Sequence, residues 1–490
     1  MDHALVILNS LADPGPRGGV KNRDAEIRGY LAQATAIPKS AREALGADPR
    51  RALEVIDPSR NSIGCLFLLD TIIASGMEHV ERQVLLDKIV HFFTSFDPVQ
   101  IRYVGAIFRN FLDFALSGGL FPPAVTVELL ATAILRIDPT GSLLTSTHLL
   151  LAKIAVESNI LEPALEVLDK EITCYPTTLS GRETRDWRRL CDPSLPPTLY
   201  ISTATGLTDG LKSSSVLEYN FLRSLVYSSR RDWSKAFAAL EQVITHPTKD
   251  RGVSKVMTEC HKRWLLVGLL NSGQVHSLPS YTSQQPVASY NSLSAEYKEL
   301  ASRFVAPSAK GLKECAETNA GIWQQDDTTS LVAEVLSSFQ KWEIFNLRKV
   351  FAEVSISQIR RLTSSALTGE PLKTDEDVIA LIQDMLGSGM LKGILKVDGT
   401  AGTFLKFGDT SSVLTEQDFA REIATRHMRI TALKQQYKEV NDRLSDKREY
   451  IKYVALEQKR AEKEGHDPGV GFDSQIEDED LMTGVVMANG

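Results

Sequence analysis

The sequence is poor in cysteine, and no two of its cysteines lie close together. Among 490 residues there are only five, Cys65, Cys174, Cys191, Cys260 and Cys315. An odd number of widely spaced cysteines suits neither a disulfide framework nor a zinc knuckle, whereas it suits reduced thiols in a reducing compartment. We therefore predict a cytoplasmic and nuclear protein without disulfides.

Long hydrophobic runs are also missing. The most apolar stretch, residues 62–77, contains Asp70 and falls short of the roughly 20 apolar residues that a membrane helix needs. The first residues carry Asp2 where a secretory signal peptide would carry lysine or arginine. We therefore expect neither segment to enter a membrane.

Positive charge is not in excess, because 55 lysines and arginines face 62 aspartates and glutamates, for a net charge of −7. Nucleic-acid binding needs a concentrated positive field, so the overall composition gives it no support. Two basic clusters keep RNA binding open as an alternative: Trp187 with Arg185, Arg188 and Arg189, and Arg230, Arg231 and Lys235 around Trp233. Both lie in or beside connectors, where solvated charge is the simpler interpretation.

Motifs of metal and nucleophile enzymes are absent from the sequence. The nine histidines form no His-x-His pair and no His-Glu-x-x-His motif, and no glycine-rich loop has the spacing of a phosphate cradle. Cys260 and His261 are adjacent, so they point in different directions on a helix, and we expect a structural role for them and for His148. We predict that the chain is not an enzyme and has no catalytic residue, metal or cofactor.

What the sequence does contain is a long succession of amphipathic helical segments. From residue 24 to 327, apolar residues recur three and four positions apart. Within residues 219–247, Trp233 stands at a turn and Ala236 at the closest approach of two helices, as in helix pairs of the tetratricopeptide type. Such pairs cannot bury their apolar faces alone, so we predict that they stack into a solenoid.

Three segments fall outside this helical pattern. Residues 1–23 form an N-terminal segment. Residues 175–215 are rich in Pro, Ser, Thr and Gly and are predicted to be a long loop or a locally disordered insertion of unknown role. Residues 276–294 are predicted to be a second polar connector, after which helix resumes.

A different pattern begins at residue 328. Its helical segments are residues 331–351, 355–367 and 374–390. Two short runs of alternating apolar residues, 394–398 and 403–407, follow around a glycine-containing loop, which is a hairpin signal. Three helices followed by a hairpin is the order of a winged helix, and we assign this module to residues 328–410.

The third of these helices decides how a winged helix could be used here. Thr374 is predicted to cap it, and residues 374–390 contain four acidic residues and no basic one. A helix that reads DNA presents Arg, Lys, Asn or Gln to the major groove, and phosphates would repel this one. Because an open strand edge is a template for a strand of another protein, we predict that the hairpin is an assembly surface instead.

A long helix is predicted after the hairpin, over residues 411–464. Apolar residues recur along it at coiled-coil spacing, interrupted at Arg426 and Lys447, so other helices are needed to cover the stripe. Residues 465–490 contain no lysine or arginine and are predicted to be a disordered acidic tail, in which Ser474 is a candidate for phosphorylation. The predicted fold is therefore mostly α-helical, with a solenoid, a winged helix and a long C-terminal helix.

This order of modules resembles the PCI family, which supplies subunits of the proteasome lid, the COP9 signalosome and translation initiation factor three. Five short segments are similar to the signalosome branch of that family, and to its third subunit in particular: residues 61–69, 100–104, 144–153, 278–284 and 293–301. The resemblance continues through the winged helix, whereas the insertion at 175–215 is longer than the family pattern.

The resemblance implies a non-catalytic scaffold subunit of the complex that deneddylates cullins and so regulates cullin-RING ubiquitin ligases. It further implies that winged-helix sheets join edge to edge, that the C-terminal helices form a shared bundle, and that the first and eighth subunits are neighbours. The residues that it assigns to these interfaces are Ile394, Val397, Phe404, Phe407, Ile423, Ile430, Leu433, Tyr437, Val440 and Leu444. A proteasome-lid or initiation-factor subunit and a free-standing RNA-binding PCI protein remain alternatives.

Overall fold

The computed structural model describes residues 2–11, 20–76, 81–117, 119–176, 190–247, 253–398, 402–408, 416–445 and 448–464. The chain forms two compact units, Met1–Phe407 and Gly408–Gly490. In the described part of the chain, no helix is both long enough and apolar enough to cross a bilayer.

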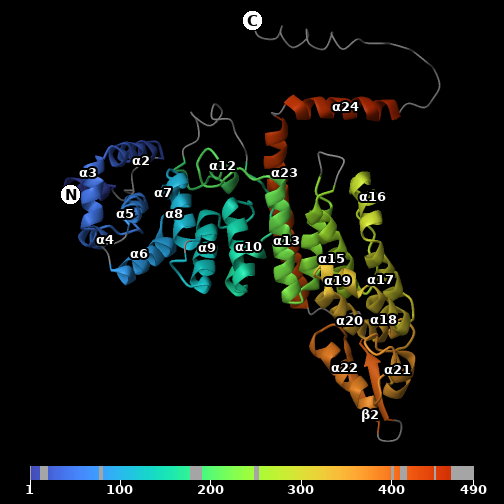
Figure 1. The fold of residues 1–490 in the computed structure, drawn as a ribbon. Coiled ribbons are helices and arrows are strands. Elements are labelled where there is room, and N and C mark those ends of the chain that lie inside the picture. The colour runs from blue at the N-terminus through green and yellow to red at the C-terminus, as the bar shows by residue number, and fades with distance from the viewer. Residues whose placement is uncertain are drawn as a thin grey trace. The chain divides into compact units, whose positions relative to one another are not determined.

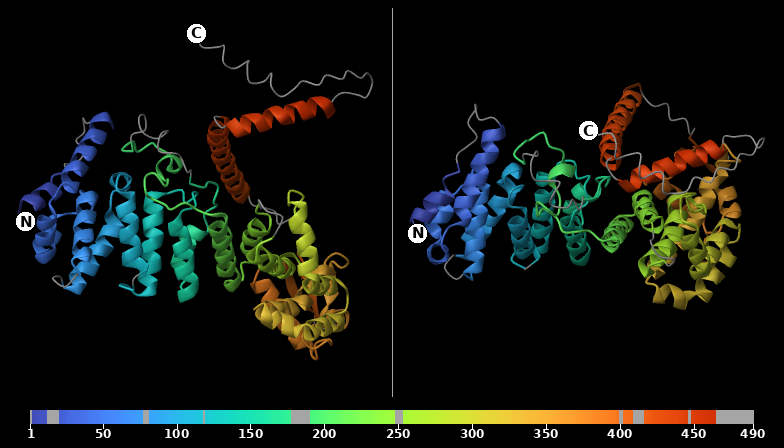
Figure 2. Two further views of the ribbon diagram at one scale, coloured as in Figure 1. Left: turned by 45° about the horizontal axis from the view of Figure 1, so that its top comes forward. Right: turned by 90° about the horizontal axis from the view of Figure 1, so that it is seen from above.

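Most of the first unit is a succession of helices. They are α1 (Asp2–Leu8), α2 (Val20–Thr35), α3 (Lys39–Ala47), α4 (Arg50–Val55), α5 (Ser62–Ala74), α6 (Arg82–Ser95), α7 (Pro98–Ile101), α8 (Gly105–Ser117), α9 (Pro123–Ile137), α10 (Ser146–Ser158), α11 (Glu162–Leu168), α12 (Pro197–Tyr200), α13 (Ser213–Ser229), α14 (Trp233–Ile244), α15 (Lys255–Ser272), α16 (Gln284–Leu293), α17 (Ala295–Val305), α18 (Ala309–Thr318) and α19 (Ala320–Gln325). Helices α8, α9, α10 and α13 lie side by side in sequence order (Figure 1), and the views of Figure 2 agree. This array confirms the predicted helical repeats.

Each helix of the array uses one face to contact the helices before and after it. In α14, the side chain of the N-cap residue Asp232 accepts a hydrogen bond from the main chain of Lys235, and Ala236 and Leu240 are buried against α13 and α15. Helix α13 places Tyr219 in the core on one side and Tyr227 in the core on the other. A continuous interior therefore runs through the repeats, as stacking requires.

The two predicted connectors differ in the structure. Residues 190–212 are largely irregular but ordered, and the guanidinium of Arg102 donates to the carbonyls of Leu190 and Asp192, at 3.1 and 2.8 Å; the basic cluster at 185–189 lies outside the described residues. The expectation for residues 276–294 was wrong in its second half, because α16 begins at Gln284. The polar composition of this segment gave no sign of a helix. The buried side chain of Tyr290 holds α16 in place, because its hydroxyl donates a hydrogen bond to the carbonyl of Ile244.

The winged helix has the predicted helices and hairpin. Its elements are α20 (Thr329–Leu347), β1 (Glu353–Ser355), α21 (Ile356–Leu362), α22 (Asp375–Gly387), β2 (Gly393–Asp398) and β3 (Gly402–Phe407). The three strands form an antiparallel sheet in the order β1-β3-β2. Strand β1 was missed by the sequence analysis because three residues are too few to show a period of two.

Helix α20 joins the solenoid to the winged helix. Its residues Val335 and Phe339 belong to the core of the last repeats, whereas Ile344 belongs to the core of the winged helix, with Val378 and Leu405. One continuous helix thus contributes to both interiors, and no flexible linker separates the two modules within the first unit.

In the second unit, the described residues form α23 (Glu416–Ser445) and α24 (Arg448–Glu464). Helix α23 is the predicted long helix, but the structure ends it at Ser445 and does not continue it to residue 464. The predicted acidic tail, with Ser474, lies outside the described residues, as does Lys447.

Candidate functional site

The register of the sheet separates a covered face from an open one. Val354, Leu405 and Leu395 are cross-strand neighbours on the face that α21 and α22 cover. Because successive side chains alternate, the opposite face carries Ile394 and Phe404 among Lys396 and Lys406. Strand β3 is central, so β2 keeps one edge without a strand partner among the described residues.

The four interface residues predicted on this hairpin are not equivalent. Ile394 and Val397 are 66% and 82% exposed, so both are available to a partner. Phe404 is half-buried on the open face between Ser355 and Lys396. Phe407 packs against the core of the winged helix, and its N–H donates to the carbonyl of Ala352, at 3.1 Å, so this residue contributes to the fold itself.

The apolar stripe of α23 is the second open surface. Its predicted residues Ile423, Ile430, Leu433, Tyr437 and Val440 are between 41% and 74% exposed, and Leu444 is half-buried. Their spacing alternates between three and four residues when Arg426 is counted, which keeps them on one side of the helix.

Sequence reasoning missed one member of this stripe. Phe419 lies four residues before Ile423, is half exposed, and extends the same spacing toward the start of α23. The four-residue spacing between Phe419 and Ile423 in the sequence could have identified it. Arg426 interrupts the stripe and pairs with Glu422 one turn earlier, at 2.8 Å, so its charge is partly balanced within the helix.

The buried cysteines and histidines of the first unit contribute to packing and not to a reactive site. Burial raises the pKa of the Cys65 and Cys260 thiols to about 12, which keeps both protonated at neutral pH, whereas a nucleophilic cysteine needs a thiolate. Burial lowers the pKa of His148 and His261 to about 3, so both are neutral; the ring of His261 stacks on Tyr290, with centroids 4.3 Å apart. Among the residues described, no group of three His, Cys, Asp or Glu side chains could hold a metal ion.

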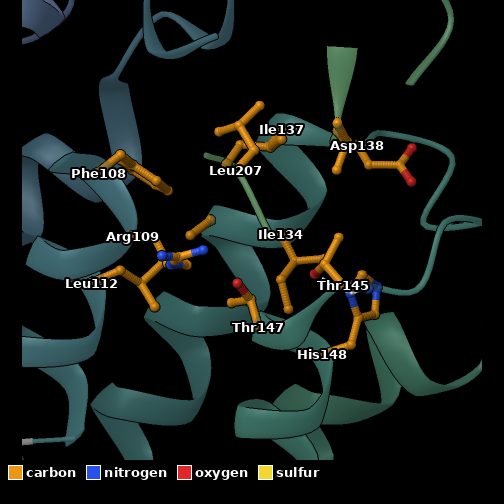
Figure 3. A pocket seen from close by; sticks show the side chains of 12 residues that line it. Phe108, Arg109, Leu112, Ile134, Ile137, Asp138, Thr145, Thr147, His148 and Leu207 are labelled. Carbon is orange, nitrogen blue, oxygen red and sulfur yellow. Dashed lines mark hydrogen bonds between the residues drawn. The ribbon is translucent and has the colours of Figure 1, made fainter. Parts of the chain in front are cut away.

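A small pocket between α8, α9 and α10 contains His148 but offers little room for chemistry. Figure 3 shows His148 beside Thr145, with which it forms a reciprocal cap of α10. The pocket holds about 20 Å³, enough for roughly one water molecule. Arg109, at its edge, is paired with Asp209 at 2.7 Å. We assign this region to packing.

The second basic cluster of the sequence analysis is neutralised in the structure. Arg231 pairs with Glu334 at 3.1 Å, Lys235 with Asp169 at 3.1 Å, and Arg230 with Glu162. Cations that already face carboxylates present little positive potential to phosphates. The described part of the chain therefore gives the RNA-binding alternative no support.

Comparison with known proteins relates the whole chain to one family. A family model described as the N-terminal helical repeats of COP9 signalosome complex subunit 3 matches residues 30–285, from α2 to α16. A curated COP9 signalosome complex subunit 3 of Neurospora crassa is 33% identical over 99% of both chains. The chain belongs to the COP9 signalosome subunit 3 family.

The subunit 3 family accounts for the whole length of the chain. A second curated member, from Emericella nidulans, is 29% identical over 73% of this chain and 72% of its own. The similarity to the Neurospora crassa protein extends past the repeats, through the winged helix and α23. The resemblance inferred from short segments of the sequence is thereby confirmed.

Proposed function

We propose that this chain is a non-catalytic scaffold subunit of a COP9 signalosome, the complex that deneddylates cullins and regulates cullin-RING ubiquitin ligases. The observation that carries the proposal is the 33% identity to a subunit 3 over 99% of both chains. A scaffold needs surfaces that its own fold leaves open, and two such surfaces are the edge of β2 and the stripe of α23.

The sheet would act through main-chain hydrogen bonds. A strand of a neighbouring subunit would continue the order β1-β3-β2 at the free edge, with Ile394 and Val397 beside it. Pairing of this kind satisfies main-chain groups on both chains, and the side chains next to the edge determine the specificity for the partner. By family analogy, the direct neighbours are the first and eighth subunits.

Helix α23 would act by burying its stripe among helices of other subunits. Each half-exposed Ile, Leu or Val that a partner covers contributes about 1 kcal/mol, since full burial of such a side chain contributes roughly 1.5–3 kcal/mol. Several such residues together, from Ile423 to Leu444, make a substantial interface. Arg426 lies in the same stripe and would help to fix the register of the bundle, as polar residues do in coiled coils.

In this proposal, another subunit of the complex carries out catalysis. The protonated thiols of Cys65 and Cys260 and the neutral, buried rings of His148 and His261 support a role without bond-breaking chemistry for this chain. The proposed compartments are the cytoplasm and the nucleus, where cullin-RING ligases act.

Affinity purification of the tagged chain from cells, followed by mass spectrometry of the co-eluting proteins, tests the proposal. We expect the other signalosome subunits in near-equal amounts. Recovery of proteasome-lid or initiation-factor subunits in their place would overturn it, as would a chain that elutes alone.

A further inference from the structure

A cleft of about 540 Å³ lies between residues 275–282 and helices α15, α16 and α17 of the first unit. Its size falls in the range of ligand pockets, about 300–1,000 Å³. Helix α15 contributes His261 and Trp264 to its walls, the loop contributes Thr282, and α17 contributes Lys298.

Two residues that line this cleft each have a buried polar atom without a hydrogen-bond partner in the described structure: Nε1 of Trp264 and Oγ1 of Thr282. Trp264 is 1% exposed and Thr282 is 8% exposed. An unsatisfied buried group costs about 1–3 kcal/mol, and native proteins contain few of them. Both atoms belong to residues that line the cleft, so a small movement of either side chain would present an unsatisfied donor to an acceptor of a bound ligand.

The charge of the cleft also favours a ligand that carries hydrogen-bond acceptors. Its lining includes Lys298 and no carboxylate, in a chain whose net charge is −7. The ammonium of Lys298 donates to the side-chain oxygen of Asn291, a neutral partner, and burial lowers the pKa of this lysine. His261, on the facing wall, is neutral because burial holds its pKa at about 3. A partly desolvated cation without a counterion favours an anionic ligand.

The main chain along the rim is also unpaired. Residues 275–278 run without helix or strand, and none of their main-chain groups forms a hydrogen bond within the described chain. The next residue is engaged, since the carbonyl of Pro279 accepts from the N–H of Thr282 at 2.9 Å. A short length of chain with open N–H and C=O groups is a template for a second extended chain.

We propose that this cleft binds an extended segment of another polypeptide that carries a carboxylate side chain. The main chain of the segment pairs with residues 275–278, its carboxylate reaches Lys298, and acceptors of the segment satisfy Trp264 and Thr282. The proposal goes beyond the scaffold function, because neither the sheet edge nor α23 contributes a residue to the cleft.

A peptide fits the walls better than a nucleic acid does. Apolar side chains of Leu265, Leu278 and Val287 line the cleft beside the single lysine. An acidic residue between apolar neighbours matches this mixture. A nucleic acid brings one charge per phosphate and needs several cations.

Fluorescence anisotropy with the full chain tests the proposal. The probes are fluorescein-labelled peptides of sequence Ser-Val-Glu-Val-Asp-Leu-Ser and its amide counterpart Ser-Val-Gln-Val-Asn-Leu-Ser, both with blocked ends. We expect the acidic peptide to bind at least about tenfold more tightly, since loss of a charge-assisted hydrogen bond costs about 1.5–3 kcal/mol.

Variants of the chain locate the binding. Lys298→Gln should weaken the acidic peptide about tenfold, and Thr282→Val about threefold, each with an unchanged melting temperature. The matched control is Lys310→Gln, on the exposed surface of α18 and outside the cleft, which should change nothing. Equal affinity for both peptides, absence of binding at about 1 mM, or a Lys298→Gln chain that binds normally would each overturn the proposal. Tighter binding of a single-stranded RNA that Lys298→Gln abolishes would overturn it in favour of nucleic acid.

Discussion

Helices α14 and α23 both carry apolar side chains three and four residues apart, yet only one of them is covered. In α14, Ala236, Leu240 and Val243 are buried because α13 and α15 pack on either side. In α23, Ile430, Leu433 and Val440 are about half exposed. The spacing shows that a helix has an apolar face, whereas its neighbours decide whether that face stabilises the fold or binds a partner.

This difference separates two kinds of measurement. Changes in the covered regions should lower the free energy of unfolding of the isolated chain. Changes in the open stripe and at the open sheet edge should leave unfolding almost unaltered and weaken assembly. The predictions below run from the largest expected effect to the smallest.

The largest effect is expected from Leu433→Asp combined with Val440→Asp in α23. Each aspartate would have to lose its hydration at the helix interface, at a cost of roughly several kcal/mol. We expect recovery of the other subunits in affinity purification to fall by at least about 100-fold. The thermal unfolding of the isolated chain should not change, because both positions are exposed there.

A matched control uses the opposite side of the same helix. Met428→Asp combined with Thr431→Asp adds the same charge at exposed positions outside the stripe. This variant should assemble normally. If both pairs reduce assembly equally, added charge rather than the stripe is responsible.

The reverse pattern is expected for Phe92→Ala in α6. Phe92 is fully buried and contacts the rings of Phe93, Phe96, Phe108 and Phe111. Its removal leaves a cavity and should lower the free energy of unfolding by about 3–5 kcal/mol, measured by urea denaturation. Val84→Ala, on the exposed side of α6, should change it by less than about 0.5 kcal/mol. Comparable losses for both variants would contradict the assigned core.

Buried His148 should make the stability of the first unit depend on pH. Burial lowers its pKa from the ordinary value to about 3, so below about pH 6.5 the unfolded chain binds a proton that the folded chain does not. The stabilisation is complete above pH 6.5 and is lost as the pH falls toward 3. At pH 5 the loss is about 2 kcal/mol.

Urea denaturation between pH 7 and pH 5 measures this contribution. His148→Gln should reduce the decrease in unfolding free energy over that interval by about 2 kcal/mol, even if the loss of its cap lowers stability at all pH values. The control is His91→Gln, at an exposed position on α6. An identical decrease in wild type and His148→Gln would show that His148 does not titrate in this way.

A smaller effect on assembly is expected from Ile394→Lys at the sheet edge. An added lysine beside an open strand disfavours pairing with another strand, and we expect subunit recovery to fall about tenfold, which is about 1.4 kcal/mol. Leu367→Lys introduces the same residue at a comparably exposed position in the loop after α21 and should have no effect. Equal recovery of both variants would argue against the edge as an interface.

Local signals in the sequence predicted most elements near these surfaces. Thr374 caps α22, as expected, and β2 and β3 pair as the predicted hairpin. Such features depend on a few consecutive residues, so the sequence is sufficient. Strand β1 and helix α16 were missed because partners far away in the sequence stabilise them: β3 for the strand, and Ile244 for Tyr290. The covering of a face is likewise a tertiary property, so the sequence could indicate the stripe of α23 but not the exposure of its residues.

The smallest effect is expected at Thr374. This residue is exposed, yet its hydrogen bonds lie within the fold, at the start of α22. Its hydroxyl accepts from the N–H of Asp377 and its own N–H donates to the Asp377 carboxylate, both at 3.2 Å. Thr374→Ala should lower the free energy of unfolding by about 1 kcal/mol, whereas Thr374→Ser, which keeps the capping hydroxyl, should not lower it. Thermal unfolding measures this, while subunit recovery should be unchanged. If Thr374→Ala reduced assembly and left unfolding unaltered, exposure alone would distinguish residues that bind a partner from residues that stabilise the fold, and contacts within the fold would not.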